Sequence, residues 1–274
     1  FFLIIILIGL NNSRKLFSFI FLKIGPFIKS KKIVEKNIYR VFGNSVDKKK
    51  IITDMWSNYG KTFVEYLYLR KFKNNLFNKK HISIDGSEKL DEIVKSNRPV
   101  IFVSGHFANF ELMSMELTKK KIKLATIYRP LNNIFLNPLM EYLRKKFICK
   151  NQIKKGRSGI RQSLDYLKNK YSIALMIDQR VSEGKNLPFF KDNALTTTLP
   201  AQLALKYKCD IVPIYIARNK DDSFEMKIFD PIKIYEKNDS EKNKIDISLN
   251  LNRIIEGMIL KDPGQWIWTH NRWK

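Results

Sequence analysis

The stretch Val100-Ile-Phe-Val-Ser-Gly-His-Phe-Ala-Asn-Phe-Glu111 carries the signals that decide the fold. Its first four residues are apolar and mostly β-branched, which is typical of a buried strand. A serine and a glycine end that strand, and residues from about 109 to 120 then follow a helical pattern that closes on lysines. We therefore expect His106 to lie in a turn between a strand and a helix.

The rest of the chain alternates short apolar runs with amphipathic segments, and no Gly/Ser/Pro-rich linker or internal repeat interrupts it. This alternation predicts an α/β fold, in which a single layered domain over residues 31–274 has a central, mostly parallel sheet flanked by helices. The 274 residues, 44% of them hydrophobic, are enough for the core of such a domain. Further strands are expected at 124–128, 173–177, 211–217 and 224–228. Further helices are expected at 48–70, 136–147, 159–168, 200–207 and 246–260.

Residues 1–30 are expected to form an N-terminal membrane-associated helical segment, an anchor or an interfacial helix, whose start is truncated or processed. Residues 1–10 are almost wholly apolar, but a hydrocarbon core of ~30 Å takes about 20 residues to cross. A second apolar run, 16–28, is broken by a lysine, a glycine and a proline, so its lysines would meet lipid headgroups. A signal peptide is disfavoured because no small-residue cleavage site follows and the flank is basic. An amphipathic helix packed on the protein's own core remains the alternative.

The chain is strongly basic, with 51 Lys and Arg against 26 Asp and Glu, a net charge of +25. Such a charge favours anionic partners, among them phosphorylated lipids, an anionic membrane surface and an acidic acyl carrier. The alternative is a solvated lysine-rich surface inflated by A/T-rich codons. Nucleic acid is not expected as a partner, because the lysines are dispersed and no nucleic-acid-binding motif is present in the sequence.

His106 and Glu111 are the residues around which we expect chemistry. A spacing of five does not stack two side chains on one helix face. With His106 in the turn and Glu111 on the first helical turn, however, the carboxylate can fold back and accept the imidazole N–H, which leaves the other ring nitrogen free to take a proton. The alternative is a histidine packed beneath the sheet with Glu111 exposed.

No metal or cofactor is expected. The two cysteines, Cys149 and Cys209, have neither metal-ligand nor disulfide spacing. The three histidines, His81, His106 and His270, are widely spaced and form no ligand pattern.

The Gly-His-x4-Glu pattern at 105–111 resembles the His-x4-(Asp/Glu) signature of the glycerolipid and lysophospholipid acyltransferase superfamily. From about residue 30 to the C-terminus, further blocks in the same order resemble the lauroyl/myristoyl acyltransferases of lipid A biosynthesis in Gram-negative bacteria. These blocks are Ile127-Tyr-Arg-Pro-Leu-Asn-Asn133, Gly156-Arg-Ser-Gly159, Met176-Ile-Asp-Gln179, Leu187-Pro-Phe-Phe190 with Thr196-Thr-Thr198, Ile211-Val-Pro213 and Pro263-Gly-Gln-Trp-Ile-Trp-Thr-His-Asn-Arg-Trp273. One departure is Ile-Phe-Leu-Asn137 after Asn133, so the acceptor-facing part of the site is left open.

The resemblance implies supporting roles for four more residues: Arg129, Arg144, Arg157 and Asp178. Arg129 would hold a phosphate or carboxylate and Arg157 a phosphate, Arg144 would match a functionally important arginine of the family, and Asp178 would belong to the site at a strand end. The alternatives are exposed surface arginines, a solvated helix face for Arg144 and a turn residue for Asp178.

The resemblance further implies an acyltransferase that moves a fatty acyl chain from acyl-acyl carrier protein to a hydroxyl of a lipid A precursor, with His106 as general base and Glu111 supporting it. Acyl carrier protein, a glycolipid acceptor and an anionic membrane would be its partners, at the cytoplasmic face of the bacterial inner membrane. Acyl chain length, acceptor hydroxyl and oligomeric state stay open. The alternatives are transfer to a lysophospholipid or another glycolipid, hydrolysis, and a non-catalytic membrane-binding role.

Overall fold

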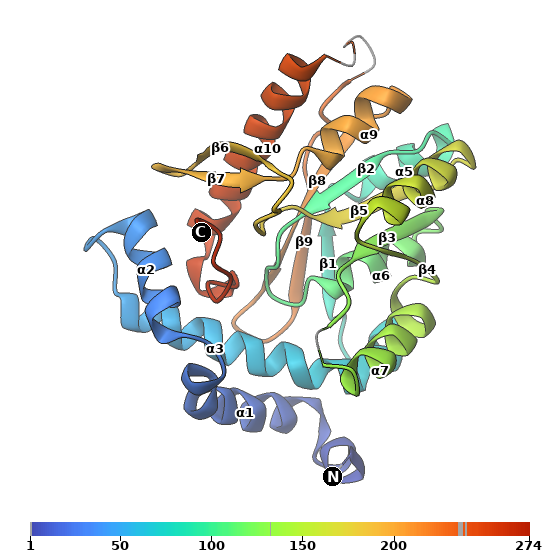
Figure 1. The fold of residues 1–274 in the computed structure, drawn as a ribbon. Helices are drawn as coiled ribbons and strands as arrows, with labels where there is room; N and C mark the ends of the chain where they lie inside the picture. The colour runs from blue at the N-terminus through green and yellow to red at the C-terminus, as the bar shows by residue number, and fades with distance from the viewer. Residues whose placement is uncertain (1, 132, 235–237, 239) are drawn as a thin grey trace.

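A seven-stranded sheet lies at the centre of the computed structural model, which describes residues 2–131, 133–234, 238 and 240–274 (Figure 1). The strand order is β1-β9-β8-β2-β5-β3-β4, and β8 pairs antiparallel with β9 while the other neighbours pair parallel. The strands are β1 (Ile82–Asp85), β2 (Ile101–Ser104), β3 (Leu124–Tyr128), β4 (Asn151–Lys154), β5 (Ser172–Met176), β8 (Ile211–Arg218) and β9 (Phe224–Ile228).

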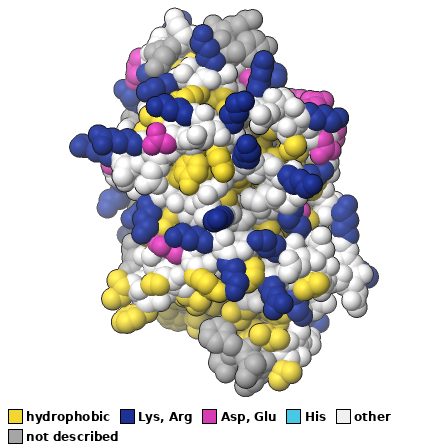
Figure 2. Space-filling view, turned by 90° about the vertical axis from the view of Figure 1, so that its right-hand side faces the viewer, with side chains coloured by type: hydrophobic (Ala, Val, Ile, Leu, Met, Phe, Trp, Pro, Cys, Tyr) yellow, Lys and Arg dark blue, Asp and Glu magenta, His cyan; other side chains and the backbone are white. Residues whose placement is uncertain are grey.

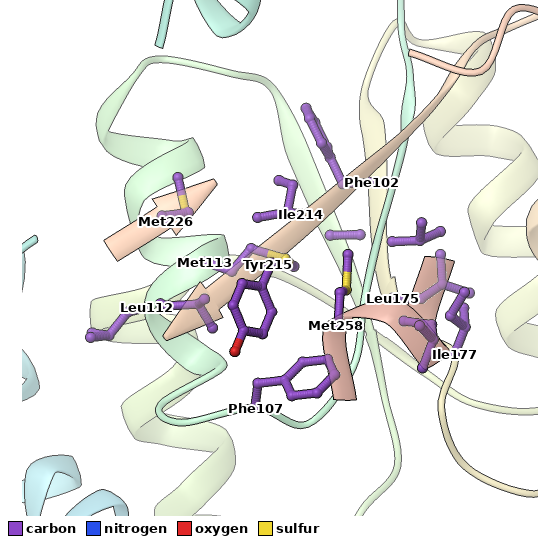
Figure 3. Packing of buried hydrophobic residues seen from close by; sticks show 14 of the residues in the cluster. Phe102, Phe107, Leu112, Met113, Leu175, Ile177, Ile214, Tyr215, Met226 and Met258 are labelled. Carbon is purple, nitrogen blue, oxygen red and sulfur yellow. The ribbon is translucent and has the colours of Figure 1, made fainter. Parts of the chain in front are cut away.

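Helices pack against this sheet and bury its central strands, as every residue of β2 shows. The helices that contact the strands of this sheet are α5 (Ser87–Ser96), α6 (Glu111–Lys119), α8 (Arg157–Lys168) and α9 (Leu199–Tyr207), and α10 (Glu241–Lys261) packs against α9. Figure 3 shows the core between them, where Leu112 and Met113 of α6 and Met258 of α10 lie around Ile214 and Phe102 of the sheet. The predicted α/β fold with a mostly parallel sheet is therefore confirmed.

Four helical segments precede the sheet: α1 (Phe2–Ile28), α2 (Lys31–Phe42), α3 (Lys48–Glu65) with η1 (Tyr66–Tyr68), and α4 (Leu69–Lys73). Contrary to the sequence pattern, α1 runs through Gly25 and Pro26 and is kinked instead at Gly9, whose φ is +78°. It packs along α3, because Gly60 has no side chain to meet the backbone of Phe17. By length and composition its residues Ile5–Ile28 could cross a membrane, although 33% of an 18-residue apolar stretch within them is buried.

The remaining elements surround the ends of the strands (Figure 1). They are α7 (Leu136–Leu143), the π-helical turn η2 (Arg144–Ile148), the hairpin of β6 (Lys185–Phe189) and β7 (Asp192–Thr196), and η3 (Pro263–Gln265). The helix expected at 136–147 thus changes from α to π geometry at Arg144, and the helix expected at 48–70 ends at Glu65. All five expected strands are present, and β1, β4 and the hairpin were not expected.

Candidate active site

His106 and Asp178 come together at the carboxyl ends of two neighbouring strands. Ser104 of β2 pairs in register with Met176 of β5, and His106 and Asp178 each lie two positions further along the chain. Because the strands are parallel, their ends meet at one edge of the sheet. Asp178 Oδ1 lies 2.8 Å from His106 Nδ1, and Asp178 Oδ2 accepts the His106 backbone N–H at 2.9 Å.

The protonation state of this pair follows from the surroundings of Asp178. Burial by itself would raise the pKa of its carboxyl, but the charge of His106 and the hydrogen bonds from His106 and Trp266 outweigh burial and lower the pKa to about 2. Asp178 is therefore an ionised acceptor at neutral pH, so His106 Nδ1 carries the proton of this hydrogen bond. Nε2 is then the basic nitrogen of a ring that is 19% exposed.

The expectation that Glu111 accepts the His106 N–H is wrong. Among the described residues, the hydrogen-bond partners of the Glu111 carboxylate are Arg144 and Tyr66, with Arg144 Nε at 2.7 Å from Oε1. Burial alone would lower the pKa of Arg144, but Glu111 and Tyr66 outweigh it and raise the pKa. Glu111 is the first residue of α6, where the helix dipole also favours a negative charge. Glu111 thus pairs with the buried Arg144 of η2, and the His106 imidazole bonds to Asp178 at the end of β5 instead.

The C-terminal segment completes the surroundings of the His106–Asp178 pair. Trp266 Nε1 donates to Asp178 Oδ2 at 2.8 Å, and the Trp266 backbone bridges to Phe107. Gly105 is required here, because a Cβ would lie 2.6 Å from the Phe107 ring. Trp266 was not expected in the site from the sequence, although its block is part of the family resemblance.

A second layer of buried polar groups holds the turn after His106. Ala108 has a left-handed φ of +43°, and its backbone is fixed by Gln265 O and Thr62 Oγ1 at 3.1 Å each. Asn109 Nδ2 donates to Glu65 at 2.8 Å, and Glu65 is fully buried. We call Glu65 with its two arginines, Arg14 of α1 and Arg218 of β8, the Glu65 cluster. It connects the N-terminal helix to the turn that carries His106.

A cationic cleft of about 800 Å³ opens beside the pair. Arg129 and Arg157, both expected in the site, line it together with Lys155 and Arg180, against one acidic side chain, Glu183. Burial, with a smaller contribution from the charge of Arg129, lowers the pKa of Lys155. Arg157 is the first residue of α8, so backbone N–H groups and positive side chains share one end of the cleft. This lining suits an anionic ligand.

His106 itself does not line the cleft. His270 does, and it lies close enough to the His106–Asp178 pair for their charges to affect its pKa. Burial lowers the pKa of His270 to about 4 despite the nearby charge of Asp178. His270 is therefore neutral at pH 7. From the sequence, His270 was expected only to be a histidine without a ligand pattern.

Of the six site residues expected from the sequence, the structure brings His106 and Asp178 into direct contact and Glu111 and Arg144 into a second pair. Arg129 and Arg157 lie in the adjoining cleft. In the part of the chain that the structure describes, no group of three or more His, Cys, Asp or Glu side chains is placed to hold a metal ion.

Comparison with known proteins gives one consistent result. The model of the family described as bacterial lipid A biosynthesis acyltransferase matches residues 1–274. The lipid A biosynthesis palmitoleoyltransferase of Escherichia coli is 26% identical over 257 residues, which are 91% of this chain and 80% of the relative. The lipid A biosynthesis acyltransferase of Shigella flexneri has the same identity and coverage. That of Haemophilus influenzae is 26% identical over 203 residues, covering 72% of this chain and 61% of the relative.

Proposed function

The chain belongs to the bacterial lipid A biosynthesis acyltransferase family, and from that premise we propose that it transfers a fatty acyl chain from acyl-acyl carrier protein to a hydroxyl of a lipid A precursor. It is an acyltransferase, and its acceptor lies in the lipid A pathway. The observation that carries the proposal is the His106–Asp178 pair at the edge of a cleft lined by cations.

In the proposed step, His106 Nε2 removes the proton of the acceptor hydroxyl while Asp178 holds the ring and stabilises the imidazolium. The alkoxide oxygen attacks the thioester carbonyl, the new C–O bond forms and the C–S bond breaks. The imidazolium returns its proton to the departing thiolate, so the carrier leaves as a thiol. No acyl-enzyme, metal or cofactor takes part in this proposal.

The oxyanion of the tetrahedral intermediate would lie near the N-terminal end of α6, where the helix dipole is positive. The N–H groups of Leu112 and Met113 in this turn already donate to Asn109 O and Phe110 O, so the dipole and not these two donors would stabilise it. The Phe110 ring, which immediately precedes this helix, lies 4.6 Å from the His106 ring. The buried Glu111–Arg144 pair would position that turn rather than touch the reacting atoms. Arg129, Lys155 and Arg157 would hold the phosphorylated headgroup of the acceptor.

Membrane association is supported by the apolar helix α1 and by the lipid pathway of the relatives. We place the protein at the cytoplasmic face of the inner membrane, where acyl carrier protein is available. The acidic surface of that carrier would be attracted by a chain of net charge +25.

The test is mass spectrometry of the lipid products after incubation with several acyl carriers and a lipid A precursor. Products one acyl chain heavier, absent with His106→Ala, are expected. A lysophospholipid and a second glycolipid serve as competing acceptors, and faster transfer to either would replace the proposed acceptor. Release of free fatty acid without an acylated lipid would indicate hydrolysis instead.

A further inference from the structure

Large apolar side chains are exposed around α7, the helix that follows the cleft-lining residues Arg129 and Pro130 in the chain. We define the α7 lobe as the exposed residues Leu131, Ile134, Phe135, Leu139 and Tyr142. Phe135 is 87% and Ile134 74% exposed. Exposing such side chains to water costs roughly 25 cal/mol per Å², so a contiguous set of them is typical of an interaction surface.

Hydrogen bonds from the backbone to two asparagine side chains fix the conformation of the α7 lobe. Asn133 Oδ1 accepts the backbone N–H groups of Phe135 and Leu136 at 3.0 Å each. Asn137 Oδ1 accepts the N–H of Leu131 at 2.8 Å. The side-chain amides therefore fix the turn that presents Phe135 outward.

The α7 lobe lies at the same end of the molecule as α1. In Figure 1, α7 and the N-terminal half of α1 both lie toward the lower end, and in Figure 2 hydrophobic side chains gather at that end while lysines and arginines cover the face above it. Two contacts link the regions: Tyr68 donates to Ile5 O of α1 at 2.6 Å, and Lys73, five positions later, donates to Lys146 O of η2 at 2.8 Å.

The exposed face of α1 is also apolar, with Leu7 83% and Phe27 91% exposed. Directly after α7 in the chain, Lys145 and Lys146 are exposed, and each cation near an anionic bilayer is worth about 1 kcal/mol. Apolar side chains next to lysines are the composition of an interfacial membrane contact.

We propose that the α7 lobe is a second membrane contact, which enters an anionic bilayer beside α1 and brings the mouth of the cationic cleft to the lipid headgroups. The residues on either side of the α7 lobe in the chain support this geometry, because Arg129 before it lines the cleft and Arg144 after it binds Glu111. A lipid acceptor could then reach the cleft with its acyl chains still in the membrane. The membrane contact itself does not depend on which acyl group is transferred.

The test uses the full chain in nanodiscs of phosphatidylethanolamine and phosphatidylglycerol, with an environment-sensitive fluorophore on Phe135→Cys. The native Cys149 and Cys209 are buried, so the introduced thiol is the accessible one. The matched control is Val94→Cys, at a position that is 41% exposed on α5, the helix that Figure 1 shows toward the end of the sheet opposite to α7. We expect blue-shifted emission at position 135 and quenching by lipids brominated within roughly 5–10 Å of the headgroup boundary, with neither at position 94.

Equal, water-like emission at both positions would overturn the proposal, as would a blue shift that needs acyl carrier protein or a second copy of the chain instead of lipid. In vesicle binding, Ile134→Ser with Phe135→Ser should weaken partitioning roughly tenfold, whereas Val94→Ser should not. The depth measurement needs no turnover. If the probe enters the bilayer but the protein has no transferase activity, only the proposed function is refuted. If the protein is active but the probe stays in water, only this inference is refuted.

Discussion

The backbone N–H and the ring Nδ1 of His106 bind the two different oxygens of the Asp178 carboxylate. One side chain thus fixes both the turn and the orientation of the ring on it. A carboxylate that only touched the imidazole would leave the ring free to rotate with the turn. Each of the two contacts is set by the register of β2 against β5.

Replacing Asp178 by Asn should lower the transfer rate roughly 10²–10⁴-fold, because an amide stabilises the imidazolium poorly and can favour the wrong tautomer. Steady-state kinetics with the acyl carrier and acceptor would measure this. Glu183→Gln, at the rim of the cleft, is the control and should retain most of the rate. An Asp178→Asn variant as fast as the parent would contradict the role given to this carboxylate.

Asp178 also predicts a pH dependence of stability. Its folded pKa of about 2 lies below the usual value of about 3.9, so the carboxylate stabilises the native state above pH ~4. That stabilisation is lost as the pH falls from about 4 to about 2. Denaturant unfolding of the parent and of Asp178→Asn should therefore differ at pH ~5 and converge as the pH falls below ~4; a difference that grows on this acidification would be inconsistent with the lowered pKa.

The Glu111–Arg144 pair should be strongly coupled. Arg144→Met leaves a buried carboxylate unpaired and is expected to lower the free energy of unfolding by about 3 kcal/mol. Adding Glu111→Gln removes that charge, so the double variant should be more stable than Arg144→Met alone. A double-mutant cycle by urea unfolding measures the coupling, and additive effects would show that the pair does not interact as described.

The cleft arginines should act on the affinity for the acceptor. Arg157→Gln removes a charged hydrogen-bond donor and should raise the KM for a phosphorylated acceptor roughly tenfold or more, with a smaller effect on kcat. Lys168→Gln, at the exposed far end of α8, is the matched control. The same KM change with a dephosphorylated acceptor would argue against phosphate as the bound group.

The Glu65 cluster should be essential for folding. Glu65→Gln leaves Arg14 and Arg218 without their shared anion and is expected to cost about 3–5 kcal/mol in the free energy of unfolding. Glu35→Gln breaks an exposed pair with Lys31 and should cost less than about 0.5 kcal/mol. Similar losses in both variants would mean that burial does not govern the value of these pairs.

Two helical glycines should respond oppositely to alanine. Helix propensity favours Gly→Ala by roughly 1 kcal/mol at a free position, as expected at Gly257 of α10, where a Cβ meets open space. At Gly60 a Cβ would collide with the Phe17 backbone, so Gly60→Ala should destabilise and loosen α1 from α3. Thermal unfolding of both variants checks this, and stabilisation at position 60 would indicate that α1 does not pack as closely as described.

The sequence pattern was sufficient to predict the central strands, because they are buried on both faces and therefore form continuous apolar runs. It missed β1 and β4 at the edges of the sheet, where polar residues interrupt the apolar pattern and Ile153 is the one buried residue. The extent of α1 was also missed, because Gly25 and Pro26 break a pattern locally while contacts with Trp56 of α3 are invisible in the sequence.

The residues of the site could be predicted from the sequence, but the pairs that they form could not. His106 and Asp178 were both recognised at strand ends, yet only the strand order shows that β2 and β5 are neighbours. Proximity in the chain suggested Glu111 instead, and no local signal indicates that Arg144, 33 positions away, neutralises it. Spacing therefore identifies candidate groups, whereas the sheet topology decides which of them meet.

Trp266 follows every strand of the sheet in the chain and still supplies a hydrogen bond to Asp178. During synthesis on the ribosome, the histidine and its carboxylate thus emerge long before the indole that completes their surroundings. The buried carboxylate therefore acquires its full set of hydrogen bonds only after translation has passed Trp266, so a nascent chain that ends before this residue holds the histidine and the carboxylate without their indole.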